Sequence, residues 1–145
     1  MLESRIKVWF GEEMNLSIQH RLDCNFLTEG CRGGWGYFDG LFLEQYGAID
    51  ATCGEPYAAS TTPDKCGGYS ECEYKAGVKD TYYVGGRAYG KVTEQALIKE
   101  LRSRGPVQLD FNAGFVYFGY KSGIMSEENP ISEAFKAQSQ VTEVP

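Results

Sequence analysis

The sequence predicts an α+β fold. Three observations carry this prediction. Apolar residues recur at helical spacing over residues 1–9 and 93–103, and residues 107–111 alternate between apolar and polar as in a half-buried strand. The stretch between the helices is rich in cysteine and glycine and lacks a clear period.

The first two helices are predicted near the N-terminus. Leu2, Ile6 and Trp9 share one helical face, and Gly11 ends that helix. A second, short helix is predicted over residues 17–22, with the first of these, a serine, as its N-cap.

A third helix is predicted over residues 37–46, closed by Gly47. We expect its apolar positions to form one buried face. These positions are Phe38, Leu41, Phe42 and Tyr46.

The second half of the chain is predicted to be loops followed by short regular elements. Residues 48–80 contain three cysteines and two prolines, which indicates loops held by cross-links, and residues 82–84 are a strand candidate. The clearest helix spans Thr93 to Ser103, with Ala96, Leu97 and Leu101 on one face. Further along we expect a strand at residues 107–111, a helical turn at residues 115–120 and a mobile tail from residue 126.

The composition indicates one globular domain. The chain has 145 residues, of which 42% are hydrophobic and 23% charged, with 14 Lys plus Arg against 20 Asp plus Glu and a net charge of −6. A nucleic-acid-binding protein normally has clustered basic residues, and none are clustered here. No apolar run approaches the roughly 18 residues of a membrane span. The sequence therefore argues against nucleic-acid partners and membrane insertion.

Five cysteines lie close together among glycine, serine and tyrosine, at positions 24, 31, 53, 66 and 72. No Cys-x-x-Cys pair occurs and the chain has a single histidine, so we expect no metal site. The clustering favours disulfides formed in an oxidising compartment, and buried thiols in a cytosolic protein are the alternative. An odd number leaves one cysteine over. Asn15 begins an Asn-Leu-Ser sequence, which is a candidate for N-glycosylation.

No set of catalytic residues can be identified from the sequence pattern by itself. The single histidine, His20, is interpreted as a solvated side chain on a surface helix, and no nucleophile elbow, zinc motif or phosphate loop is present. Gly33 and Gly34 leave backbone groups open, as pairing with an extended peptide requires. An ordinary tight turn is an equally good interpretation of the two glycines.

Several motifs, in order, resemble the papain-like cysteine peptidases. Residues 30–34, Gly-Cys-Arg-Gly-Gly, are similar to the family's Gly-Cys-x-Gly-Gly motif, and residues 16–24 are similar to the Leu-Ser-x-Gln…Asp-Cys segment that precedes it. Residues 53–57 resemble the Cys-x-x-Pro-Tyr element, and residues 105–107 resemble the Gly-Pro-Val strand. Within the family, Met-Leu-Glu-Ser-Arg-Ile at the start and Tyr-Tyr-Val-Gly-Gly at residues 82–86 resemble the cathepsin C branch.

The resemblance covers residues 1–124 and leaves residues 125–145 as an unmatched polar tail. It implies an incomplete papain-like fold, mostly the helical half with the first part of the β-rich half. The family's catalytic cysteine and oxyanion glutamine would precede Met1, and its histidine and asparagine would follow Pro145. We therefore expect this chain to be inactive by itself.

The resemblance also implies roles for the cysteines. It pairs Cys24 with Cys66 and Cys53 with Cys72. Cys31 would bond to a cysteine upstream of the nucleophile and is therefore unpaired here. The family further implies a lysosomal or secreted location.

Carried over residue by residue, the family's substrate cleft maps onto a few positions. Gly33, Gly34 and Trp35 would contact the substrate, with the two glycines pairing with its backbone. Tyr37 and Tyr83 match two tyrosines that help to bind a chloride ion in cathepsin C. No other cofactor is implied. Gly36 stands where the family has a proline, so the resemblance does not predict the conformation of this loop.

Three hypotheses follow. The first is a segment of a cathepsin C-like peptidase, whose partners would be peptide or protein substrates and the remaining parts of the same enzyme. The second is a short papain-like pseudoenzyme that binds peptides or another chain. The third is an unrelated disulfide-rich domain. The ordered motifs favour the first.

Overall fold

The computed structural model describes residues 1–86, 91–109 and 120–122. These residues belong to two compact units. Unit 1 comprises residues 1–82 and 100–106, and unit 2 comprises residues 83–99 and 107–145. The expected turn at residues 115–120, except for its last residue, and the tail from residue 126 lie outside the described residues.

Helix α1 (Leu2–Phe10) forms as expected. It ends at Gly11, whose positive φ of 71° lets its N–H reach the carbonyl of Lys7 and close the last turn. Ile6 is buried and Leu2 is partly buried, whereas Trp9 is 54% exposed and donates its indole N–H to the carbonyl of Arg104. Of the three residues predicted to share the buried face of α1, only Leu2 and Ile6 pack against the core.

Helix α2 (Ile18–Cys24) begins at the predicted cap and runs two residues further than expected. The Ser17 hydroxyl accepts the N–H of His20 at 3.1 Å, which satisfies one of the free donors at the start of the helix. At the other end, Asp39 accepts hydrogen bonds from Arg21 at 2.8 Å and from Asn25 at 3.2 Å. These bonds tie the end of α2 to α3 (Gly36–Gln45).

The predicted buried face of α3 is wrong in part. Phe42 is 2% exposed and lies in the core, but Phe38 is 42% exposed and Tyr46 is 52% exposed. The neighbouring Leu43 is buried instead. The α3 residues that belong to the core, Phe42 and Leu43, both lie in the second half of the helix, so the first half contributes no buried residue to it.

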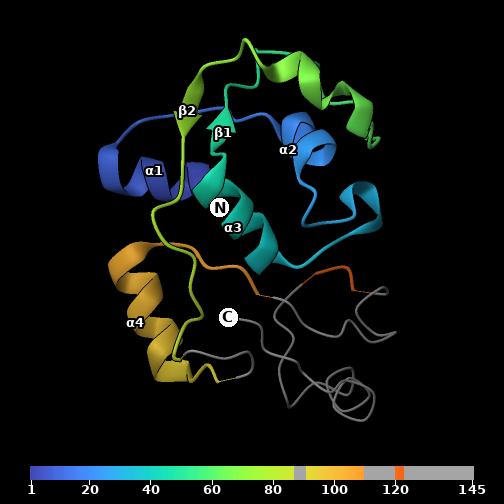
Figure 1. Cartoon of the computed structure of the whole chain (residues 1–145). Coiled ribbons are helices and arrows are strands. Elements are labelled where there is room, and N and C mark those ends of the chain that lie inside the picture. The colour runs from blue at the N-terminus through green and yellow to red at the C-terminus, as the bar shows by residue number, and fades with distance from the viewer. Residues whose placement is uncertain (87–90, 110–119, 123–145) are drawn as a thin grey trace. The chain divides into compact units, whose positions relative to one another are not determined.

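A small antiparallel sheet follows α3 (Figure 1). Strand β1 (Ala48–Ile49) pairs with β2 (Tyr74–Ala76), and Leu16 forms an isolated bridge with Asp50. Residues 48–80 are thus not loops alone, because two short strands and the 3₁₀ segment η2 (Pro63–Tyr69) lie within them. Sheet and helices enclose one core in unit 1, made of Ile6, Leu16, Phe42, Leu43, Ala48 and Ala76.

Helix α4 (Glu94–Arg104) agrees with the prediction, and the Thr93 hydroxyl accepts the N–H of Ala96 at 3.2 Å. Its predicted apolar face is less buried than expected, since Leu101 is 45% exposed. The buried residue of the helix is Glu100, which forms ion pairs with Arg5 at 3.1 Å and Arg104 at 3.3 Å. The ion pair between Arg5 and Glu100 thus links α1 to the second half of α4.

The two predicted C-terminal strands are not seen. Residues 82–84 lead into a turn, and residues 107–109 belong to no strand, while the remainder of the second candidate lies outside the described residues. A strand needs a partner edge for its backbone groups. The described part of the chain provides none at these positions. Nor does any helix in the described ranges have the length and apolar character of a membrane span.

Candidate functional site

Gly33 and Gly34, here called the glycine strip, lie on an exposed loop between α2 and α3. A single 3₁₀ turn, η1 (Gly30–Arg32), precedes it. The carbonyl of Gly33 accepts the N–H of Glu29 at 2.9 Å, and the N–H of Gly33 donates to the carbonyl of Gly30 at 3.0 Å. Both backbone groups of Gly33 are therefore used inside the loop, contrary to the expectation that both glycines are open.

Gly34 differs from Gly33 in this respect. It is exposed, and neither its N–H nor its C=O bonds to another described residue. A methyl carbon added to its Cα would lie 2.6 Å from Cβ of Thr28, which is closer than real contacts allow. Only glycine fits here without movement of the loop. The residue that must be glycine is also the one whose backbone is free to pair with another chain.

Trp35 follows directly and is the N-cap of α3. Its carbonyl accepts the N–H groups of Phe38 at 2.9 Å and Asp39 at 3.2 Å, so its backbone is fixed by the helix. Its side chain is 54% exposed. An indole ring held next to an open peptide group provides apolar surface for a bound side chain.

The loop is held in place by Thr61, which belongs to a distant segment. The Thr61 hydroxyl accepts the backbone N–H of Cys31 at 2.8 Å. Gly30 has a φ of 56°, and a methyl carbon at its Cα would lie 2.1 Å from the Thr61 Oγ1. Residues 30 and 31 therefore fit closely against Thr61, and the position of the strip depends on the position of that residue.

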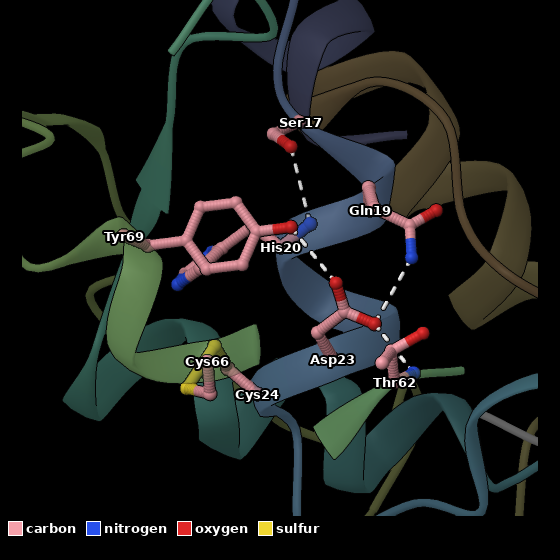
Figure 2. Close-up of a disulfide and its surroundings, with 8 residues drawn as sticks. All are labelled: Ser17, Gln19, His20, Asp23, Cys24, Thr62, Cys66 and Tyr69. Carbon is pink, nitrogen blue, oxygen red and sulfur yellow. Dashed lines mark hydrogen bonds between the residues drawn. A yellow bond between two sulfur atoms is a disulfide. The ribbon is translucent and has the colours of Figure 1, made fainter. Parts of the chain in front are cut away.

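Two buried side chains of α2 fix the segment that contains Thr61 (Figure 2). Asp23 accepts the N–H of Thr62 at 2.7 Å and the side-chain amide of Gln19 at 3.0 Å, both through Oδ1. Gln19 in turn accepts the N–H of Ala58 at 2.9 Å and donates to the carbonyl of Ser60 at 2.8 Å. Three backbone groups of residues 58–62 thus bond to side chains of α2.

The 3₁₀ segment η2 is attached to the same turn of α2. Tyr69 donates its hydroxyl to Oδ2 of Asp23 at 2.8 Å, and Cys66 is joined to Cys24 by a disulfide (Figure 2). Burial, together with the hydrogen bond to the Asp23 carboxylate, raises the pKa of Tyr69. The hydroxyl therefore stays protonated and remains a donor at physiological pH.

The prediction that His20 is a solvated surface residue is wrong. Its ring is 8% exposed and lies between Tyr69, at 5.1 Å between ring centroids, and Phe42, at 5.8 Å. Burial and the nearby Arg21 lower its pKa, whereas Asp23 raises it. Its Nδ1 has no hydrogen-bond partner among the described residues. The face of α2 that carries His20 is covered by η2, a long-range contact that the local sequence does not reveal.

The sequence model of the group described as "Papain family cysteine protease" matches residues 1–143. The chain belongs to the papain family of cysteine proteases. The fold just described is the family's, in partial form.

The family match is supported by individual relatives. Cathepsin C of Schistosoma mansoni is 32% identical over 130 residues, which are 85% of this chain and 27% of that protein. Cathepsin K of Mus musculus is 29% identical over 129 residues, which are 88% of this chain and 37% of that protein. The chain therefore spans between about a quarter and two fifths of the length of these curated relatives.

A solved structure gives the same fold. The Carica candamarcensis cysteine protease CMS1MS2, crystallised in complex with E-64, superposes with a TM-score of 0.69 at 24% identity. The match covers 88% of this chain and 56% of that one. At this identity the likeness is one of fold. The boundary that we placed at residue 124 stays a prediction.

The remaining residues implied by the papain-family resemblance are placed as follows. Cys24 pairs with Cys66 and Cys53 with Cys72, as the resemblance implied, and Cys31 is a free, exposed thiol next to the strip. Tyr37 lies in the first turn of α3, in unit 1, and Tyr83 lies in unit 2. The chloride site stays a prediction. Within the described ranges, no three His, Cys, Asp or Glu side chains are grouped as a metal site would require.

Sequence reasoning missed the residues that hold the papain-family strip in place. Gln19 and Asp23 are polar, and they were recognised only as letters of a motif. Thr61 carried no signal at all, because its partner lies 30 residues away. A buried polar residue can be inferred from a sequence only when its partners are known.

Proposed function

We propose that these 145 residues are a segment of a cathepsin C-like cysteine peptidase, and that the segment supplies part of the substrate cleft but none of the catalytic Cys, His or Asn. In such an enzyme, a cysteine thiolate attacks the peptide carbonyl, and a histidine protonates the leaving amine. The part played by this chain is to bind and align the substrate backbone beside that reaction.

The observation that carries the proposal is that the backbone N–H and C=O of Gly34 bond to no other described residue. An extended peptide pairs with a strand-like edge through main-chain N–H and C=O groups. Gly34 presents both groups on an exposed loop, beside the half-exposed ring of Trp35. Because Gly34 is exposed, water can occupy both groups in the free chain, and a bound peptide backbone can replace that water.

Several hydrogen bonds and a disulfide hold the site in place, which favours alignment of a ligand. Thr61, Gln19 and Asp23 connect the loop to a helix that is itself anchored by a disulfide. A preorganised strip loses less conformational freedom on binding than a flexible one. Two disulfides further support the proposal that the protein works in a lysosomal or extracellular compartment.

The test is a titration of the ¹⁵N-labelled chain with a short extended peptide, followed through backbone amide signals. We expect the Gly34 amide signal to shift with peptide concentration. The Gly67 amide is the internal control, because Gly67 lies in η2, away from the strip, and should not respond. Absence of any shift at Gly34 up to millimolar peptide would contradict the proposal.

A matched pair of variants separates loss of the strip from unfolding. Gly34→Ala places a methyl group against Thr28 and should abolish the shift. Adding Thr28→Gly removes the side chain that is in the way, so the double variant should recover part of the response. If the single variant binds as well as the wild type, Gly34 is not the contact.

Catalysis is tested separately. The purified chain should release no fluorophore from dipeptide amide substrates, with or without a covalent cysteine-peptidase inhibitor. Inhibitor-sensitive turnover would refute the proposed division of roles. If the natural gene product also binds peptide and has no turnover, the function is that of the papain-like pseudoenzyme.

A further inference from the structure

We propose that Asn15 carries an N-linked glycan that is attached before α2 docks onto the rest of unit 1. Asn15, Leu16 and Ser17 form the chain's one Asn-x-Ser/Thr sequence. The inference rests on the secretory route proposed above but requires no peptidase activity.

Asn15 itself is well placed to carry a sugar in the folded protein. It lies in the segment between α1 and α2, and its side chain is exposed. Its backbone carbonyl accepts the N–H of Ala51 at 2.8 Å, so the main chain is fixed there. Its side-chain amide bonds to no other described residue. A glycan on that amide displaces no contact of the fold.

The other two residues of the sequence are inaccessible once the chain has folded. Leu16 is 9% exposed, and its N–H donates to the carboxylate of Glu3 at 2.7 Å. Ser17 is 3% exposed, and its N–H donates to the carbonyl of Ile49 at 2.9 Å. The Ser17 hydroxyl, which defines the acceptor sequence, is already bonded to the N–H of His20.

A transferase that must recognise this hydroxyl cannot reach it in the folded chain. The burial of Ser17 therefore sets the order of events: modification comes first, while the segment is still extended, and capping of α2 follows. In the finished protein the same hydroxyl caps the helix, and only Asn15 remains at the surface.

The chemistry is a transfer from a lipid-linked oligosaccharide. The side-chain nitrogen of Asn15 attacks the anomeric carbon of the first sugar, and a C–N bond forms. The bond from that carbon to the pyrophosphate oxygen breaks, the amide loses one proton, and the lipid pyrophosphate leaves. No oxidant or metal ion is consumed.

The site is tested by translating the full chain behind a cleavable leader in the presence of endoplasmic reticulum microsomes. We expect one endoglycosidase-sensitive mobility shift, lost in Asn15→Gln. Ser17→Thr should keep the shift. Ser17→Asp should lose it although aspartate still caps a helix, so this variant separates the sugar from the fold. If the wild-type chain shows no shift while a reference glycoprotein is modified, the proposal is overturned.

The order of events needs a second measurement. Purified oxidised chain and reduced, alkylated chain are each offered to solubilised transferase with a lipid-linked donor. We expect modification of the reduced chain and at least a ten-fold lower yield for the oxidised chain. Equal yields would overturn the proposed order. Because the leader delivers the chain to the lumen, a negative microsome result opposes the glycan and not the proposed location.

Discussion

Replacing Asp23 tests whether one carboxylate anchors the segment behind the glycine strip. Its side chain is buried, at 5% exposure, and accepts three hydrogen bonds, from Gln19, Thr62 and Tyr69. A hydrogen bond to a charged group contributes about 1.5–3 kcal/mol, and bonds that share one acceptor are not additive. Asp23→Ala leaves three donors unpaired. We expect it to lower the free energy of unfolding by about 3–5 kcal/mol.

The assay is denaturant unfolding of the oxidised chain, followed by circular dichroism. A loss of this size is a large part of the stability of a small domain, so milder variants are needed as well. Tyr69→Phe removes one of the three bonds and should cost about 1–2 kcal/mol. Asp64→Ala is the matched control, because Asp64 is an exposed aspartate in the same η2 segment. Its effect should stay within about 0.5 kcal/mol.

The reasoning fails if Asp23→Ala and Asp64→Ala destabilise the chain equally. A local measurement gives a second criterion. The N–H of Thr62 donates to Asp23, so its hydrogen exchange should accelerate in Asp23→Ala more than that of the Ala76 N–H in the sheet. Uniform acceleration across the chain would show that Asp23 acts on global stability alone.

Three further outcomes are expected. Because burial lowers the folded-state pKa of His20, the unfolded chain binds its proton first, and stability should fall as the pH decreases below about 6.5. His20→Phe should flatten this dependence between pH 7.5 and 5, and an unchanged slope would rule out His20 as its cause. Removing the Cys24–Cys66 bond, which closes a separation of 42 residues, should cost about 4 kcal/mol in the chain-entropy account, and a cost below about 1 kcal/mol would contradict it. Thr61→Val removes the acceptor of the Cys31 N–H and should speed its exchange about five-fold, whereas unchanged exchange would show that the bond is not formed in solution.

Local signals in the sequence predicted the helices well. Gly11 ends α1, the Ser17 hydroxyl caps α2, and Thr93 caps α4, because each of these signals acts within four residues of its own position. The boundaries of these helices follow from backbone groups that need a nearby partner. Tertiary contacts are not required to locate them.

Burial was harder to predict, because it depends on segments far away in the sequence. His20 and Phe38 illustrate the two kinds of error. The histidine is buried by η2, which is joined to α2 by a disulfide more than 40 residues further along the chain. Phe38 has the helical spacing of a buried position, but no distant segment in the described ranges buries it. Strand candidates failed for the same reason, since alternation at residues 107–109 shows a preference but not a partner strand.

The candidate site was located from a motif and explained by the structure. Resemblance placed the substrate strip at two glycines, yet only Gly34 has free backbone groups, because Gly33 closes the turn. The distinction depends on a φ of 108° at Gly33 and on the Thr28 side chain beside Gly34. Neither the φ of Gly33 nor the position of the Thr28 side chain can be predicted from the amino-acid sequence.

The neighbouring positions of Asp23 and Cys24 also determine how the chain is oxidised. Hydrogen bonds from Thr62 and Tyr69 to Asp23 hold η2 against α2, and Cys66 lies between these two donors in sequence. We therefore expect these contacts, where they form first, to bring the thiols of Cys24 and Cys66 together at a high effective concentration. Cys31 is held on a different loop by the bond from its N–H to the Thr61 hydroxyl. In this account the noncovalent contacts of Asp23 favour the pairing of Cys24 with Cys66, and the disulfide then makes that pairing covalent.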